Sequence, residues 1–152
     1  MRAISLWQPW ATAVAIGIKK VETRSWQTKY TGPIAIHAAK RWAKPEQEFA
    51  AVEHALGRLP KRLPFGAIIA TATLIGCRMT EDVEHQVDAI ARIYGNYAPG
   101  RFAWFLTDIV ALEEPLPFKG SQGFFNVPDE LVAAKLPSNA RFSRASSGEA
   151  DG

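Results

Sequence analysis

The stretch Gly66-Ala-Ile-Ile-Ala-Thr-Ala-Thr-Leu-Ile-Gly-Cys77 is the most hydrophobic segment of the chain. Its two threonines are the only interruptions among apolar residues and glycines. A nearly continuous apolar run of this length is typical of a strand that is buried on both faces. We therefore expect this segment to form the strand that crosses the centre of the fold.

Shorter elements are expected on both sides of this strand. Polar and apolar residues alternate in Arg2–Leu6, as in a half-buried strand, and Pro9 and Pro45 fit the first turns of two helices. Thr80 is the expected cap of a third helix. The complete prediction has strands at 2–6, 21–24, 34–39, 66–77, 102–106 and 109–118, and helices at 9–16, 45–57, 80–95 and 129–136.

These elements predict an α+β fold, namely a small mixed or antiparallel β-barrel decorated with short helices. Helices do not alternate regularly with strands, which argues against a doubly wound parallel sheet. Pro115 and Pro117 place the 109–118 strand at an edge or a bulge. Phe49, Val52 and Leu56 are expected to form the apolar face of the 45–57 helix.

Length and composition indicate one globular domain. The chain has 152 residues, of which 47% are hydrophobic and 22% charged, and no apolar run approaches the ~20 residues of a membrane-spanning helix. We assign residues 1–137 to this domain and expect 138–152, which are mostly small and polar, to be a disordered tail. The single cysteine and the lack of a signal-peptide pattern favour a reducing, cytoplasmic setting without a membrane partner.

Positive charge and tryptophan are concentrated at the start of the chain. Residues 1–44 contain eight basic side chains and one acidic side chain, a formal charge of +7, so the remainder carries −4. Four of the five tryptophans lie in the same third. Cations attract phosphates and aromatic rings stack on bases, so this combination favours RNA, a nucleotide or a nucleoside as the partner. A basic, solvated face over a tryptophan core is the competing interpretation.

Several common kinds of site find no support in the sequence. The three histidines are scattered without the spacing of a zinc site, and a Gly-x-Ser-x-Gly nucleophile motif is absent. Glycine-rich phosphate loops are also absent. We therefore predict no metal ligands and no cofactor.

The candidate site is Gly17-Ile-Lys-Lys-Val-Glu-Thr-Arg-Ser-Trp26, a dense run of charged and aromatic residues between two apolar segments. Strand alternation places Glu22 and Arg24 on one face of the 21–24 strand, and Lys19 precedes it. Lys19 and Glu22 are the candidate catalytic residues, because a buried lysine beside a carboxylate can become a base or nucleophile. An ordinary ion pair is the alternative.

Further candidates for ligand binding follow the same stretch. Trp26 and Tyr30 lie in a predicted loop, where large aromatic rings are available for stacking on bases. His37 points from its strand either to solvent or into the mouth of the barrel beside Lys19 and Glu22.

The motifs together resemble the bacterial and phage branch of the ASCH family, across about residues 2 to 128. The resemblance rests on Ile4-Ser5-Leu6-Trp7-Gln8-Pro9-Trp10-Ala11, Gly17-x-Lys19-x-x-Glu22-x-Arg24-x-Trp26, Tyr30-x-Gly32-Pro33, Ile36-His37-Ala38, Phe102-Ala103-Trp104 with Asp108, Pro115-Leu116-Pro117 and Lys119-Gly120-x-Gln122-Gly123. It implies a PUA-like barrel with a cleft for RNA or a nucleoside. Some family members are amidohydrolases that deacylate modified cytidine, and others are described as ribonucleases.

The chain departs from the amidohydrolase pattern at one position. That branch has a threonine three residues after its lysine, whereas Glu22 follows Lys19 here, and Thr23 keeps the interval only from Lys20. The branch also has a distant glutamate, for which Glu81 is a candidate. A ribonuclease instead needs cations for the phosphate and a group that moves protons.

Two more residues complete the set of candidates. Lys40 adds a cation, and Ser121, in a loop flanked by glycines, either approaches the same mouth or belongs to a simple turn. RNA or nucleotide binding by a basic, aromatic cleft is our leading hypothesis, with a ribonuclease or nucleoside amidohydrolase as the alternative. A small-ligand or adaptor module without basic walls is the third.

Overall fold

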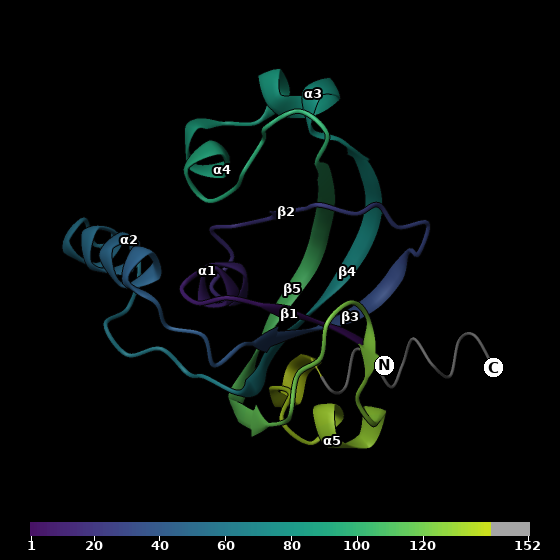
Figure 1. Cartoon of the computed structure of the whole chain (residues 1–152). Coiled ribbons are helices and arrows are strands. Elements are labelled where there is room, and N and C mark those ends of the chain that lie inside the picture. Colours follow the sequence, from purple (N-terminus) through teal and green to yellow (C-terminus); the bar gives the residue numbers. More distant parts are fainter. Residues whose placement is uncertain (141–152) are drawn as a thin grey trace.

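The computed structural model describes residues 1–140, which form an α+β fold around one six-stranded sheet (Figure 1). The strand order is β2-β5-β4-β3-β1-β6; β1 and β3 are parallel and the other neighbours are antiparallel. The strands are β1 (Arg2–Leu6), β2 (Val21–Arg24), β3 (Gly32–Ala38), β4 (Ala67–Met79), β5 (Phe102–Pro117) and β6 (Phe125–Asn126). In this part of the chain no pairing joins β2 to β6, so the sheet does not close into the expected barrel.

Short helices surround the sheet. They are α1 (Trp10–Ala15), α2 (Lys44–Ala55), α3 (Thr80–Val83), the 3₁₀ turn η1 (Glu84–Gln86), α4 (Ala89–Ile93) and α5 (Asp129–Ala133). In Figure 1, α3 and α4 lie at the top of the long strands, α5 lies at the bottom and α2 stands at the left. Within residues 1–140 no helix is long and apolar enough to cross a membrane. Most of the predicted tail, from residue 141 onward, lies outside the described residues.

The central position of the apolar segment is confirmed. It forms β4, which pairs with β3 on one side and β5 on the other, and Ala67–Ala72 are buried without a break. Both faces of such a strand are covered, so apolar side chains are favoured at every position and not only at every second one. The nearly continuous apolar run in the sequence follows from this position.

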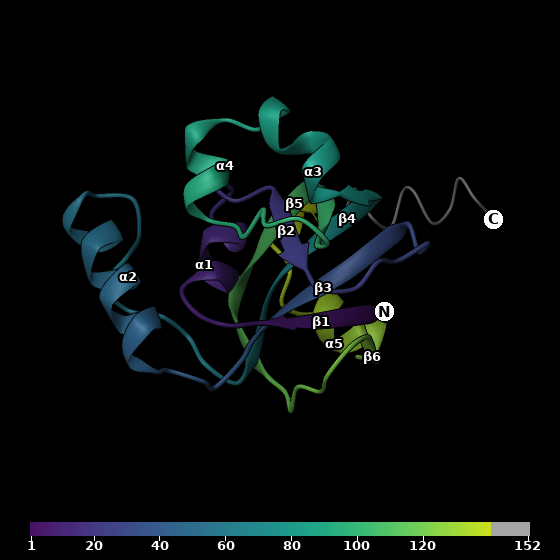
Figure 2. The ribbon, with the colours of Figure 1, turned by 45° about the horizontal axis from the view of Figure 1, so that its top comes forward.

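Alternating side chains divide the core into two clusters on opposite faces of the sheet. Ile4, Ile34 and Ile36 belong to the cluster that also contains residues of α1. Their neighbours Ala3 and Ala35 belong to the second cluster, with residues of α5 and the segment behind it. Figure 2 shows β1 and β3 side by side, as their parallel register requires. The period of two in strand side chains therefore gives this sheet a helix-covered layer on each face.

The predicted helix at 80–95 is wrong as a single element. Helical geometry ends after η1, where Val87 is extended, and restarts when the Asp88 carboxylate caps α4 by accepting from the Ala91 amide at 2.8 Å. Thr80 is not a cap but a helical residue, buried, whose hydroxyl donates to the Ala98 carbonyl at 2.8 Å. The aspartate at a new N-cap position splits the helix.

The predicted apolar face of α2 is also wrong. Val52 and Leu56 are both 58% exposed, whereas the face turned inward contains Glu46 and Glu53, with Phe49 between them. Both sets have the i, i+3, i+7 spacing of one helix face. The acidic face is buried because arginines pair with both carboxylates, Arg41 with Glu46 and Arg58 with Glu53.

The two strands predicted at 102–106 and 109–118 form the single strand β5. The chain bends at Asp108, whose φ of 50° is in the left-handed region that aspartate tolerates better than most residues. Only 102–105 also pair with β2. The half that contains Pro115 and Pro117 has a partner on one side, which confirms the expected edge position.

Candidate functional site

A large open cleft lies where several chain segments end. Its volume is about 1550 Å³. Its walls come from the ends of β1, β2, β3 and β5, from the turn 94–96 and from the loop 117–123. The segment 119–123 matches the glycine-flanked loop of the sequence analysis, and it closes one side of the cleft.

Within residues 1–140, positive side chains outnumber negative ones in the lining of the cleft. Four cationic side chains line it, against one carboxylate, that of Glu22. Six aromatic side chains line it as well. The cations are Arg24, Lys40, Arg101 and Lys119, and the aromatic residues are Trp7, Trp10, Trp26, Phe49, Tyr94 and Phe118.

Lys19 lies beneath the floor of the cleft rather than on its surface. The residue is only 2% exposed, and its ammonium donates to the carbonyls of Val21 at 2.8 Å and Tyr94 at 2.6 Å. Its third neighbour is Glu22, with Nζ 3.4 Å from Oε1. Burial lowers the pKa of Lys19, and attraction to Glu22 partly offsets that effect. Three acceptors around Nζ match the three donors of an ammonium group.

Glu22 is the buried carboxylate that faces the cleft. Its Oε1 accepts from the Thr23 amide at 3.0 Å and faces Lys19, while Oε2 lies 3.4 Å from Nη1 of Arg24. Strand alternation placed Glu22 and Arg24 together, and their contact agrees with that expectation. The carboxylate thus sits between a cation below it and a cation beside it.

Arg24 has unused donors inside the cleft. Within residues 1–140 its Nη1 makes only long contacts of 3.4 Å, to Glu22 and to the Ser5 carbonyl, and its Nε is buried without a partner. The guanidinium lies 5.6 Å from the ring centroid of Trp26 and 5.7 Å from that of Trp104. Because arginine offers five donors in a planar fork, this group is suited to a carboxylate, a phosphate or a base edge.

His37 holds the glycine-flanked loop against the sheet. Its Nε2 lies 2.8 Å from the Phe118 carbonyl and its Nδ1 lies 2.9 Å from the Ser5 hydroxyl. Because a carbonyl only accepts, we assign the proton to Nε2, and in the neutral ring Nδ1 accepts from Ser5. Burial lowers the pKa of His37 below its ordinary value of 6.5, and the hydrogen bond to Phe118 opposes that shift.

Gly120 is the point of closest approach between this loop and the sheet. A Cβ at residue 120 would lie 2.5 Å from Cε1 and 2.7 Å from Nδ1 of the His37 ring. Glycine is therefore required by the lack of space above the imidazole, since 120 does not have a positive φ.

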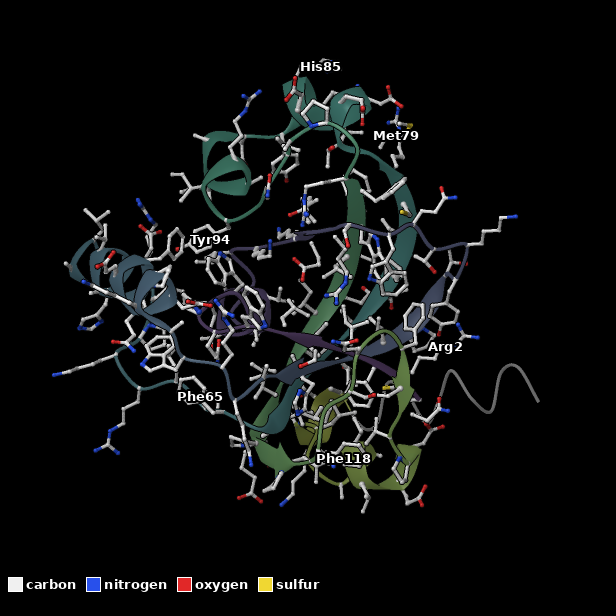
Figure 3. All side chains as sticks on the ribbon, in the orientation of Figure 1. Arg2, Phe65, Met79, His85, Tyr94 and Phe118 are labelled. Carbon is white, nitrogen blue, oxygen red and sulfur yellow. The ribbon has the colours of Figure 1, made fainter. Side chains whose placement is uncertain are left out.

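Tyr94 connects the floor of the cleft to α2. Its carbonyl accepts from Lys19, and its hydroxyl donates to Glu53 Oε1 at 2.5 Å. Glu53 is paired at the same time with both Nε and Nη2 of Arg58, which holds the pKa of this carboxyl below its usual range. Burial, followed by the bond to Glu53, raises the pKa of Tyr94 to about 12. Figure 3 shows Tyr94 between α2 and α4.

The structure brings most of the predicted binding residues to the cleft. Arg24, Trp26, His37, Lys40 and Ser121 all line it. Trp26 presents only part of its ring, because it packs edge-to-face on Trp104 at 4.7 Å between ring centroids.

Three other predicted residues lie elsewhere. Tyr30 is not in the lining: its hydroxyl donates to the Pro33 carbonyl at 2.6 Å, and Arg2 lies over its ring. Lys19 lies below the floor. Glu81 accepts from the Gly100 amide at the α3 end of the molecule and does not line the cleft.

Sequence reasoning did not single out several lining residues. Ser5, Asn96 and Arg101 reach the cleft from segments assigned to other roles. Arg101 Nη2 donates to the Thr23 carbonyl at 3.2 Å, and the Thr23 hydroxyl accepts from the Asn96 amide at 2.8 Å. Lys119 had a visible signal, because it adjoins Gly120 in the family motif. No group of three or more potential metal ligands occurs within residues 1–140.

Replacing Gly120 with alanine is expected to lower the free energy of unfolding by about 1–3 kcal/mol, as overpacking usually does. The new methyl group would displace the His37 ring and its bonds to Ser5 and Phe118. Urea unfolding measures the change. Gly76→Ala is the matched control, because a Cβ at 76 meets nothing within 4 Å. Equal stabilities for the two variants would contradict this packing argument.

The lowered pKa of His37 predicts a pH-dependent stability. The unfolded chain binds a proton at His37 as pH falls below about 6.5, while the folded protein resists it, so the free energy of unfolding should fall with pH from there down to the folded pKa. His37→Gln, which keeps a donor and an acceptor, should flatten this dependence in urea unfolding between about pH 5 and 7.5. His85→Gln, at an exposed histidine, should leave it unchanged. Identical pH slopes in all three proteins would refute the assignment.

Comparisons with known proteins place this geometry in a family. The model of the ASCH domain matches residues 4–116. Activating signal cointegrator 1 of mouse and of human are each 30% identical over 95 residues, which is 59% of this chain and 16% of each of those proteins. The chain therefore corresponds to a small part of these relatives.

Solved structures share the fold at low sequence identity. The crystal structure of ASCH from Zymomonas mobilis has a TM-score of 0.58 at 17% identity and covers 90% of this chain and 95% of its own. A mutant of the same protein, in which a tyrosine is replaced by phenylalanine, gives 0.57 at 17% identity, with coverages of 90% and 98%. The fold is thus PUA-like, as the sequence motifs implied, and the chain belongs to the ASCH domain family.

Proposed function

We propose that the cleft binds single-stranded RNA, with one nucleotide seated over Glu22 and Arg24. The observation that carries this proposal is the state of Arg24. Its guanidinium is fixed beside a buried carboxylate and two tryptophans, yet in the part of the chain that the structure describes its Nε has no partner and its Nη1 contacts are long. A ligand that accepts hydrogen bonds would satisfy these donors.

The surroundings of Arg24 support a nucleotide over other anions. Glu22 supplies an acceptor next to the arginine donors, so the pair can meet the mixed donors and acceptors of a base edge. Lys40, Lys119 and Arg101 line the walls, where they would attract the backbone phosphates. Cationic walls also count against an adaptor that binds no nucleic acid, for which a cleft without such walls is expected.

Arg24→Ala is expected to weaken binding of an eight-nucleotide single-stranded RNA by roughly 10-fold or more, since hydrogen bonds to a charged group contribute about 1.5–3 kcal/mol each. Fluorescence anisotropy measures the affinity. Lys29→Ala is the matched control, because Lys29 is exposed and does not line the cleft. The affinity of the wild type should fall by about 0.7 logarithmic units for each tenfold rise in salt concentration and each contacted phosphate. Salt-insensitive binding, or equal effects of both substitutions, would count against the proposal.

Hydrolysis of RNA or of an acylated nucleoside is the second candidate function. The observation that favours it is the buried Lys19, 3.4 Å from a carboxylate that faces the cleft. The Lys19 ammonium, which donates to two carbonyls, would hold the Glu22 carboxylate in place through their ion pair. Glu22 would accept a proton from a water molecule or a ribose hydroxyl. Arg24 would then stabilise the negative charge that develops on the attacked group.

If the protein is a hydrolase, Glu22→Gln should abolish product formation while weakening RNA binding less than Arg24→Ala does, because the amide keeps the shape and one acceptor oxygen but takes up no proton. The assay follows cleavage of RNA and deacylation of N4-acetylcytidine by chromatography. Glu81→Gln, an acidic residue outside the cleft, is the control and should keep full activity. An inactive wild type, or an active Glu22→Gln protein, would remove this function from consideration.

A further inference from the structure

Beside the cleft lies a group of exposed aromatic residues that the fold does not use as core. Trp7 is 49% exposed, and Trp42 and Phe65 are each 37% exposed. None of the three belongs to the hydrophobic clusters of the described residues. Together with Arg41 they form what we call the aromatic platform. In Figure 3, Phe65 lies below α2, well away from Met79 and His85 at the top of the view.

The platform is held in place before any ligand arrives. The Arg41 guanidinium lies 3.9 Å from the ring centroid of Trp7, and Arg41 Nε donates at 2.5 Å to Glu46, which is buried on α2. Trp42 and Phe65 meet edge-to-face at 5.2 Å between centroids. Rings ordered in this way lose little conformational entropy when another flat group stacks on them.

The platform is continuous with the cleft. Trp7 lines the cleft, and so does Lys40, the residue before Arg41. Gly66, the residue after Phe65, also lines it, and its amide donates to the Ala38 carbonyl at 2.7 Å. The Lys40 side chain lies across Gly66, where a Cβ would be 2.7 Å from Lys40 Cε. The two loops of the platform thus meet at the rim of the cleft.

The two loops carry more positive charge than their neighbours neutralise: Arg41 and Lys44 pair with Glu46 and Glu48 of α2, and Lys40, Lys61 and Arg62 have no ion pair within residues 1–140. Residues 39–44 and 60–66 contain five basic side chains and no acidic one: Lys40, Arg41, Lys44, Lys61 and Arg62. A hydrophobic protein segment would gain little from such charge, whereas a phosphate backbone requires it. Cations interleaved with exposed rings are the arrangement by which proteins hold unpaired nucleotides.

We infer that the aromatic platform is a second subsite, on which nucleotides flanking the one in the cleft stack when single-stranded RNA binds. This inference rests on the proposed function and adds to it that the ligand is a strand that extends beyond one nucleotide. In this arrangement the bases stack on Trp42 and Phe65. Lys61 and Arg62, which are exposed in the loop that leads to Phe65, contact the phosphates that join these bases.

The test compares a short and a long ligand, AMP and the RNA octamer rA8, by calorimetry and anisotropy. Trp42→Ala is expected to weaken rA8 binding by roughly tenfold, the usual effect of losing one stacked base, and to change AMP binding less than about twofold. Leu131→Ala, an exposed apolar residue of α5 outside the cleft, is the control and should alter neither. Circular dichroism verifies that each variant is folded.

A second variant keeps the test decisive if Trp42→Ala does not fold. The Lys61→Ala, Arg62→Ala double substitution removes two cations, and it should weaken rA8 and reduce the salt dependence of its affinity, again without effect on AMP. The DNA octamer dA8 shows whether the ribose hydroxyls contribute.

The outcomes separate the inference from the proposed function. If AMP binds and rA8 binds no more tightly, or if the platform variants bind rA8 like the wild type, the inference is overturned while the cleft proposal stands, and the platform is then a surface for a protein. If neither AMP nor rA8 binds the wild type, the proposed function fails and the inference fails with it. Selective loss of rA8 affinity in the platform variants supports both.

Discussion

One buried cation connects the parts of this protein that form the cleft. Lys19 follows the end of α1 in the sequence. Its ammonium donates to the Val21 carbonyl of β2 and to the Tyr94 carbonyl in the turn after α4. It also faces Glu22 at 3.4 Å. Removing any of these acceptors would leave a charge in a dry environment, which proteins tolerate poorly. The position of Glu22, and through it that of Arg24, therefore depends on three segments meeting at one nitrogen atom.

Much of the sheet could be predicted from local pattern, because burial on both faces leaves a continuous apolar run and burial on one face leaves alternation. Errors arose where a single polar or charged side chain, rather than the hydrophobic pattern, decided the outcome. On α2 two faces share Phe49 and have the same helical spacing, and the sequence alone favours the apolar one. The acidic face is buried because Arg41 and Arg58 come from outside the helix to meet it. Each arginine lies only five residues from its glutamate, but hydrophobic periodicity carries no information about such ion pairs.

The site shows the same division. The Lys19, Glu22 and Arg24 group is local, so strand alternation and spacing were enough to find it. The bond between His37 and the Phe118 carbonyl joins residues 81 positions apart, and no short-range pattern reports it. The loop position of Tyr30 predicts a ring that is free to stack, yet its hydroxyl donates to the Pro33 carbonyl only three residues away. The flanking glycines indicated the loop 119–123, and the structure shows which residues lie beside it in the cleft.

The contact between Gly120 and the imidazole of His37 has a consequence for how related sequences can vary. Nothing larger than glycine fits at 120 while a full ring occupies 37, so the two positions constrain each other as a pair. A relative with alanine at the first position is expected to carry a slimmer side chain at the second. Such a relative must then fasten its loop to the sheet with some other donor for the carbonyl at 118. A substitution at only one of the two positions would be disfavoured, so residues 37 and 120 are expected to change together among related sequences.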